Sequence, residues 1–296
     1  MGKKPRRYQS QPAGFWRQEV GGAPYWFLAA AAVTLVAFGV YVAMNAPSQS
    51  VASSDRKPQP EISTPAPEPV VRTQPAEVLS RLEDTSRPFV VSVLGDSTGA
   101  IGQSWVYQLA SWMSDTYGRP VEFHQWAVEL TPNQYQPVQY IGEGDGAPIV
   151  IWNGSASGRP VSYAMETWDG LLPVDAATVD LAFVNHGHNQ APGTLTRDAS
   201  GLLSKMQASM VNAAIVVIGQ NPQTEVGPMA NAQADNVRSW MARAAGAGYA
   251  TVDVLTIFEE YGDYALLLDA EGVHPTVEGS RFWADAVIAT LTAPGE

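Results

Sequence analysis

The chain has 296 residues, 45% of them hydrophobic, and carries a formal net charge of −12. This length and apolar content are enough for at least one domain with a sizeable core, which excludes a chain that is disordered throughout. Because the sequence contains no cysteine, disulfides and thiolate metal sites are excluded as well.

The charge is unevenly distributed along the chain. Residues 1–24 hold five lysines and arginines and one glutamate, whereas residues 87–296 hold eight basic and 22 acidic side chains. So acidic a region repels a nucleic-acid backbone, and we therefore expect no nucleic-acid partner.

The uncharged stretch at residues 25–44, YWFLAAAAVTLVAFGVYVAM, is predicted to be a transmembrane helix. It is close to the ~20 residues that cross a bilayer, and the basic segment 1–24 before it predicts a cytoplasmic N-terminus. The alternative is a cleaved signal peptide, for which the small residues at 43–46 offer a cleavage site. Either interpretation places the rest of the chain outside the cytoplasm, anchored to the membrane in the first case and secreted in the second.

Residues 45–86 are rich in proline, serine and charge, and we expect them to form a linker. From residue 87 to residue 296, strand-like and helix-like patterns alternate, which predicts a single α/β domain with a parallel sheet between two layers of helices. In such folds ligands bind at the carboxyl ends of the strands. Ser97, Asn153 and Asn189 each follow a predicted strand and are expected at this edge.

The first predicted strand, FVVSVLG, runs into the sequence GDSTG at residues 95–99. A phosphate-binding loop would need a lysine after its last glycine, but Gln103 follows Gly102, so that interpretation fails. The pentapeptide fits the G-x-S-x-G nucleophile elbow, although that elbow normally follows several earlier strands. The remaining interpretations are a nucleophilic Ser97 at the end of the first strand and an ordinary strand-to-helix turn.

A base for this serine is offered near the C-terminus by the sequence DAEGVHPT. His274 lies three residues after Glu271, and an imidazole whose tautomer a carboxylate fixes can take the proton of a serine hydroxyl. Two polar loops, NGSASG at 153–158 and NHGHNQ at 185–190, provide glycine amides and an asparagine side chain that could stabilise an oxyanion.

Together these segments resemble the SGNH, or GDSL-type, hydrolase family. Its GDS, glycine, G-x-N and D-x-x-H-P blocks correspond in order to Gly95-Asp96-Ser97, Gly158, Gly187-His188-Asn189 and the Glu271–Pro275 segment. The resemblance implies a three-layer α/β/α fold of the flavodoxin-like type. It also implies Ser97 as nucleophile, His274 as base, and an oxyanion hole formed by the Ser97 amide, the Gly158 amide and the Asn189 side chain.

The chain departs from the family pattern at two positions. Gln190 stands where an aspartate usually follows the asparagine, and Glu271 stands where the acid is usually aspartate. We expect Glu271 to be the third member of the triad, and Asp269 is the alternative acid.

The sequence thus predicts a membrane-tethered, extracytoplasmic serine esterase that needs no cofactor or metal. Its substrates would be O-acylated carbohydrate of the cell envelope or, second, lipid esters. One alternative is a non-catalytic module of the same fold that binds glycan or a protein partner. Another is a metal held by His186 and His188, with His124 or a carboxylate as third ligand.

Overall fold

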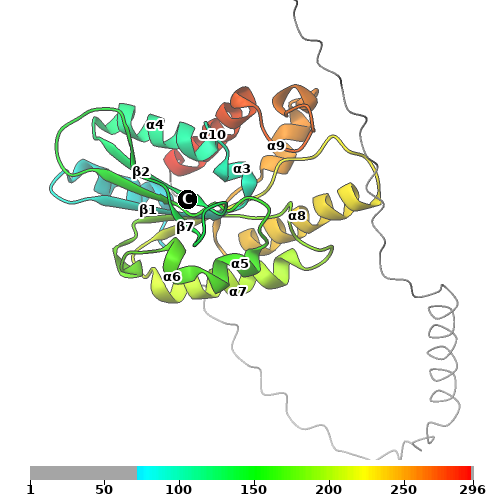
Figure 1. The fold of residues 1–296 in the computed structure, drawn as a ribbon, viewed down its shortest axis with the longest axis horizontal. Coiled ribbons are helices and arrows are strands. Elements are labelled where there is room, and N and C mark those ends of the chain that lie inside the picture. Colours follow the sequence, from blue (N-terminus) through cyan, green and yellow to red (C-terminus); the bar gives the residue numbers. More distant parts are fainter. Residues whose placement is uncertain (1–71, 295–296) are drawn as a thin grey trace, which may run out of the picture. The chain divides into compact units, whose positions relative to one another are not determined.

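The computed structural model describes residues 72–294. In this part of the chain an eight-stranded sheet lies between two layers of helices (Figure 1). The six parallel strands, in their order across the sheet, are β2 (Val121–Ala127), β5 (Ile149–Asn153), β1 (Phe89–Gly95), β6 (Leu181–Asn185), β7 (Ala214–Ile218) and β8 (Ala250–Val252). The predicted mixed α/β fold with a central parallel sheet is therefore confirmed.

Two short strands extend the sheet beside β2. β3 (Gln134–Tyr135) and β4 (Gln139–Ile141) both pair with it in the antiparallel direction. The sequence patterns did not indicate either strand, because each is too short to show an alternation.

Five of the parallel strands lie in the flavodoxin-like order. In that order the first strand of the chain lies between the second and the third, and β1 here lies between β5 and β6, followed by β7 and β8. β2 is an additional parallel strand on the outer side of β5. The pattern of apolar residues in a strand indicates whether the strand is buried, but it does not indicate which strands lie beside it. The strand order could therefore not be derived from the local pattern.

Each face of the sheet is covered by its own set of helices (Figure 1). One face packs against α2 (Pro75–Leu79), α4 (Trp105–Tyr117) and α10 (Val277–Thr292). The other packs against α5 (Val161–Glu166), α6 (Trp168–Leu171), α7 (Leu195–Ser209) and α8 (Pro228–Gly246). α9 (Val254–Glu260) contributes buried side chains to both sides, at the edge next to β8.

The first helical layer shows why the apolar pattern of the sequence produces this packing. Trp105 on α4 stacks on Trp283 of α10 with ring centroids 6.1 Å apart, and it packs edge-to-face with Phe183 on β6 with ring centroids 5.6 Å apart. All three side chains are fully buried. α4 ends at Gly118, whose φ of 61° is the left-handed conformation that favours glycine after a helix.

The packed region begins earlier than residue 87, where the linker was predicted to end. α2 and the 3₁₀ helix η1 (Ser80–Glu83) bury Val78, Leu79 and Leu82 in the core. Three apolar residues in a proline-rich stretch are too few to predict a packed helix. Their burial also depends on contacts with α10, which is distant in the sequence.

A buried arginine just before β2 forms hydrogen bonds with this segment and with the loop before β5. Arg119 has no exposed surface, and its guanidinium donates hydrogen bonds to the carbonyls of Leu82 (3.0 Å), Arg87 (2.7 Å) and Ala147 (2.9 Å). Burial lowers the pKa of Arg119 more than nearby Asp84 raises it. Residues 82–87 are therefore part of the domain.

None of the helices found within residues 72–294 is both long enough and apolar enough to cross a membrane. The predicted transmembrane helix at 25–44, the basic segment 1–24 and most of the predicted linker lie outside the described residues.

Candidate active site

The nucleophile turn lies where β1 ends. Asp96 follows Gly95 and caps α3 (Ser97–Ala100), its carboxylate accepting a hydrogen bond of 3.2 Å from the Thr98 N–H. A Cβ atom at Gly95 would lie 2.9 Å from the Asn185 carbonyl, so the close approach of β1 and β6 requires a glycine. The turn therefore presents Ser97 at the first position of α3, on the carboxyl edge of the sheet.

Buried polar side chains support this turn from below. The Thr98 hydroxyl lies 3.0 Å from Asp96 Oδ1 and 3.1 Å from both Asn185 Oδ1 and Gln220 Oε1. The Gln220 amide donates to Asp96 Oδ1 at 3.2 Å, and the Trp105 indole donates to Asn185 Oδ1 at the same distance. These contacts join the ends of β1, β6 and β7 in one buried network, which limits the movement of the serine.

The structure brings His274 to Ser97 as predicted, across 177 positions of sequence. His274 Nε2 lies 2.9 Å from Ser97 Oγ, a hydrogen-bond distance. The histidine comes from the loop before α10, and its side chain is 27% exposed. A base and a hydroxyl in this geometry can exchange a proton without further rearrangement.

The carboxylate beside the histidine is Asp269, whose Oδ2 lies 3.5 Å from His274 Nδ1. Burial alone would raise the pKa of Asp269. Hydrogen bonds from the Val273 and His274 backbone N–H groups, together with the nearby imidazole, outweigh this effect, so the pKa of Asp269 lies below its usual value. The aspartate is therefore ionised near neutral pH and can hold Nδ1 in its protonated form.

Glu271, the expected acid, does not occupy this position. The structure shows no hydrogen bond or ion pair between Glu271 and His274 among the described residues, although the two side chains lie within 4.8 Å of each other. The expectation assumed that one turn of the loop would bring residue 271 to face residue 274. Instead the chain reverses, with the Asp269 N–H donating to the His274 carbonyl at 2.8 Å, so Asp269 and not Glu271 faces the imidazole.

Two hydrogen bonds from the loop after β7 stabilise the reversed conformation of residues 269–274. The Thr224 N–H donates to the Gly272 carbonyl at 2.9 Å, and the Asn221 side chain donates to the Val273 carbonyl at 2.9 Å. Asn221 was not identified from the sequence. Its only signal is its place three residues after the end of a buried strand and before Pro222.

The expected oxyanion groups differ in how the structure places them. The Ser97 N–H is at the first position of α3, where a helix has no internal acceptor for it. Asn189 Nδ2 is buried and lacks a hydrogen-bond partner within the described part of the chain. Gly158 lies in an exposed turn with a φ of 69°, and its loop is tied to the nucleophile turn by a 2.9 Å hydrogen bond from the Ala156 N–H to the Gly95 carbonyl.

His186 and His188 do not form the metal clasp considered as an alternative. The His188 Nε2 lies 2.9 Å from the Asn221 carbonyl and must donate to it, because a carbonyl can only accept. Among residues 72–294, the one group of side chains spaced to hold a metal consists of Asp269, Glu271 and His274, without either of these histidines. His186 is completely buried, and this burial lowers its pKa to about 4.

No protein-family model matches the chain, and no curated protein matches its sequence. Solved structures do match its fold. A protein described as a GDSL-like lipase, from Parabacteroides merdae, is 16% identical, with a TM-score of 0.50 over 70% of this chain and 96% of that one. The described part of the chain has the fold of the GDSL-type, or SGNH, hydrolases, as the order of its motifs predicted.

Two further structures give the same result. One is a mutant of an acetyl-xylooligosaccharide esterase from Geobacillus stearothermophilus, 15% identical, with a TM-score of 0.50 over 71% of this chain and 96% of that one. The other is an α/β-hydrolase enzyme from the metagenome of Lake Arreo in Spain, 13% identical, with a TM-score of 0.50 over 70% of this chain and 96% of that one. At these identities the likeness concerns the fold.

Proposed function

We propose that the chain is a serine esterase that cleaves carboxylic esters through an acyl-enzyme. The observation that carries this proposal is the alignment of three side chains. Ser97 Oγ lies 2.9 Å from His274 Nε2, and Asp269 Oδ2 lies 3.5 Å from the other ring nitrogen. A nucleophile, a base and an orienting carboxylate in this order are what acyl transfer requires.

In the first half of the reaction, Ser97 Oγ attacks the ester carbonyl carbon while His274 Nε2 takes the hydroxyl proton. The carbonyl oxygen becomes an oxyanion, which the Ser97 N–H, the Gly158 N–H and the Asn189 amide would stabilise. Asp269 keeps the proton on Nδ1 and stabilises the imidazolium. When the tetrahedral intermediate collapses, the C–O bond to the alcohol breaks, and the imidazolium gives its proton to the departing alkoxide.

In the second half, a water molecule replaces the alcohol. His274 removes a proton from the water as it attacks the acyl carbon, and then returns that proton to Ser97 Oγ when the acyl–serine bond breaks. The products are the alcohol and the carboxylic acid, and the enzyme is restored.

We place this domain outside the cytoplasm on a membrane anchor formed by residues 25–44. The support is the uncharged length of that stretch and the basic residues that precede it. An extracytoplasmic position favours O-acylated carbohydrate of the cell envelope as substrate, with lipid esters second. The acidic domain disfavours polyanionic substrates.

The esterase proposal is tested by following 4-nitrophenyl acetate hydrolysis by the full chain and by Ser97→Ala. We expect the wild type to turn over and Ser97→Ala, correctly folded by circular dichroism, to lose nearly all activity. Ser239→Ala, at an exposed serine on α8, serves as the matched control. A folded wild type without turnover on acetyl esters would instead favour a non-catalytic binding module.

The location is tested on intact cells that express the chain with a tag before Lys3. Added protease should release a fragment of the folded domain and leave the tag protected. Mature protein that begins near Ala46 would contradict the anchor and indicate a cleaved signal peptide.

A further inference from the structure

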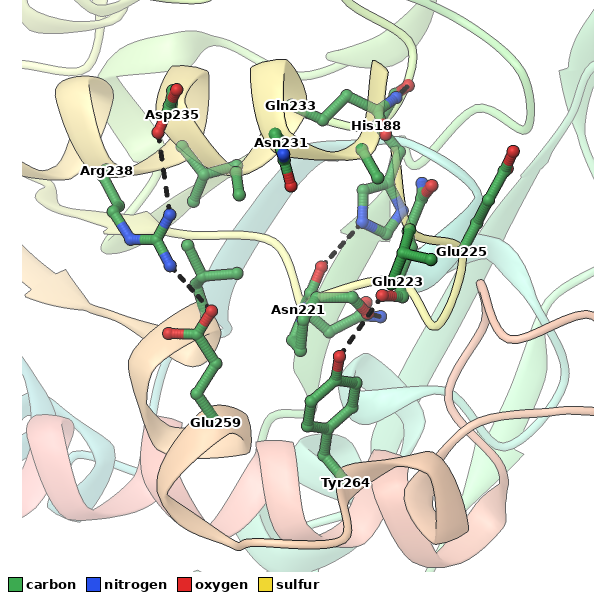
Figure 2. A pocket seen from close by; sticks show the side chains of 16 residues that line it. His188, Asn221, Gln223, Glu225, Asn231, Gln233, Asp235, Arg238, Glu259 and Tyr264 are labelled. Carbon is green, nitrogen blue, oxygen red and sulfur yellow. Dashed lines mark hydrogen bonds and ion pairs between the residues drawn. The ribbon is translucent and has the colours of Figure 1, made fainter. Parts of the chain in front are cut away.

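A histidine next to the proposed oxyanion donor is held by two other segments of the chain. His188 directly precedes Asn189 in residues 185–190, which we call the oxyanion loop. Its ring Nε2 lies 2.9 Å from the Asn221 carbonyl, and its own carbonyl accepts a hydrogen bond of 2.6 Å from the Gln233 side chain on α8. Figure 2 shows the ring contact at the wall of a cavity of about 360 Å³. Because His188 and Asn221 both line that cavity, hydrogen bonds rather than packed side chains hold the ring on this side.

The His188 ring is a neutral hydrogen-bond donor in the folded domain. Burial, the largest effect, and the nearby His274 lower its pKa more than Asp96 and the contact with Asn221 raise it. Near neutral pH the ring therefore carries one proton, and this proton is on Nε2, because a carbonyl can only accept. The other ring nitrogen, Nδ1, is buried and has no hydrogen-bond partner within residues 72–294. In this part of the chain the contact with Asn221 is therefore the one hydrogen bond that fixes the ring.

Asn221 continues this contact to the loop that carries the base. Its side-chain amide donates to the carbonyl of Val273, the residue before His274, at 2.9 Å. Within the described part of the chain, no hydrogen bond joins the oxyanion loop directly to residues 269–274, the base loop. His188 and Asn221 thus form a bridge of two hydrogen bonds between these loops.

The proposed reaction needs the two loops in a fixed relation, because groups on both of them act on one ester. The Asn189 amide is to stabilise the carbonyl oxygen, while His274 takes the Ser97 proton and then protonates the leaving alcohol. Such donors act at about 2.7–3.1 Å from the oxyanion, and a misplacement of ~1 Å can cost ~10²-fold in rate. A link between the loops should therefore act on kcat.

We propose that His188 is a positioning residue, which through Asn221 holds the Asn189 amide and the His274 ring in the relative arrangement that the reaction requires. The inference rests on the proposed esterase function. His188 acts on the two groups that contact the substrate and does not need to contact it. Its contribution depends on the hydrogen bond that Nε2 donates, so a side chain with a donor at the same reach should replace it.

Three substitutions in the full chain separate the donor from the bulk of the ring. His188→Phe keeps a planar ring but cannot donate. His188→Gln ends in an amide N–H₂ group that reaches about as far as Nε2, whereas His188→Asn carries the same amide on a shorter side chain. His124→Phe is the matched control, because His124 is on β2 and its side chain makes no hydrogen bond within residues 72–294.

We expect His188→Phe to lower kcat on 4-nitrophenyl acetate by about tenfold or more, because a buried carbonyl loses its partner and both loops lose a constraint. KM should change far less than kcat. His188→Asn should cause a similar loss, and it takes the place of His188→Phe if that variant does not fold. His188→Gln should recover most of the wild-type kcat, and His124→Phe should leave kcat unchanged.

Two results would overturn the inference while the wild type remains active. One is an unchanged kcat in folded His188→Phe and His188→Asn, with only the unfolding midpoint lowered, which would indicate a purely structural residue. The other is a loss of kcat in His188→Gln as large as in His188→Asn, which would show that the donor at Nε2 is not what matters.

A double-mutant cycle tests the bridge itself. His188→Phe and Asn221→Ala break successive links of one bridge, so the second substitution should add little once the first is present. The double variant should lose about as much kcat as His188→Phe alone. Losses that multiply would show that the two residues act independently and would contradict the bridge.

A measurement without substrate separates this inference from the esterase function. Long-range ¹H–¹⁵N NMR spectra of the histidine rings, with the His188 signals assigned from their loss in His188→Gln, should show the His188 proton on Nε2 at neutral pH. A proton on Nδ1 contradicts the bridge alone, whatever the activity. A wild type with the proton on Nε2 and no turnover of 4-nitrophenyl acetate keeps the bridge and contradicts the esterase function on which its catalytic role depends.

Discussion

Ser97 and His274 lie 2.9 Å apart, but the chain holds them in very different surroundings. Ser97 is only 8% exposed and belongs to a strand–turn–helix unit whose polar groups are buried and joined across three strands. His274 comes from an irregular, half-exposed loop that is fixed by a few hydrogen bonds from the segment after β7. The nucleophile is thus placed by the core of the fold, and the base by contacts between neighbouring loops.

This difference predicts where a single substitution is most damaging. Ser97 is positioned by many buried contacts, so the loss of one of them leaves the others in place. The side chains that contact the His274 loop and position the base are few, chiefly the Asp269 carboxylate and the Asn221 amide. The following predictions test this contrast, beginning with the largest expected effect.

Asp269→Asn should cause the largest loss on the base side. Asparagine keeps the shape but no longer favours the tautomer with the proton on Nδ1, and the analogous change in a serine protease lowers kcat by ~10⁴-fold. We expect a loss of at least ~10²-fold here, since the aspartate is partly exposed and more weakly coupled. The measurement is kcat on 4-nitrophenyl acetate.

Glu271→Gln is the matched control for this change, since it removes the same charge from the same loop. It should lower kcat by less than about threefold, because no hydrogen bond links Glu271 to His274 in the structure. A large loss in Glu271→Gln with little loss in Asp269→Asn would return the role of the acid to Glu271.

Asn189→Ala tests the third loop, which belongs to neither side. Its buried Nδ2 has no partner within the described residues. In the proposed mechanism it gains one when the oxyanion forms. Removing one such donor typically costs ~10²–10³-fold in kcat. KM should change far less than kcat. An unchanged kcat would mean that Asn189 only shapes its loop.

His186 tests the nucleophile side through stability. Burial holds its folded-state pKa at about 4, below the ordinary value of 6.5. The unfolded chain therefore binds more protons between these values, and the stability present above pH 6.5 is lost as the pH falls toward 4. Lowering the pH from about 7 to about 4.5 should cost about 2–3 kcal/mol through this residue.

The measurement for His186 is the free energy of unfolding in urea at the two pH values. His186→Gln should have a smaller pH dependence than the wild type by this amount. Equal pH dependence in the two proteins would show that the histidine is not held neutral beneath the nucleophile turn.

Apart from the control Glu271→Gln, Asn221→Ala should have the smallest effect of the series. It removes the side-chain hydrogen bond to the Val273 carbonyl, and one such bond is worth ~0.5–1.5 kcal/mol. If that bond positions the base, kcat should fall by roughly three- to tenfold while KM and the unfolding midpoint change little. A shift of the unfolding midpoint without a change in kcat would contradict a positioning role.

The same contrast explains how much of the site could be predicted from the sequence. The apolar strand 89–95, the serine after it and the histidine before the last helix were identified because each belongs to a regular element or directly borders one. Asp269 was placed second because its position depends on a chain reversal around Gly272, whose φ is 70°, and not on helical spacing.

Longer-range features could not be derived from local patterns. The strand order, the contribution of Val78 and Leu82 to the core and the bridge made by Asn221 all depend on segments that are far apart in the chain. Each requires knowing which surfaces meet, and a single sequence does not contain that information in its periodicity.

The central claim is that Ser97 is a nucleophile that His274 activates, and covalent labelling tests it most directly. The full chain is treated with a fluorophosphonate, and the modified peptide is identified by mass spectrometry. We predict one adduct, on the peptide that contains Ser97, which forms far more slowly in His274→Ala and is absent in Ser97→Ala. An adduct on a different serine, or equal labelling rates in the wild type and His274→Ala, would contradict the account.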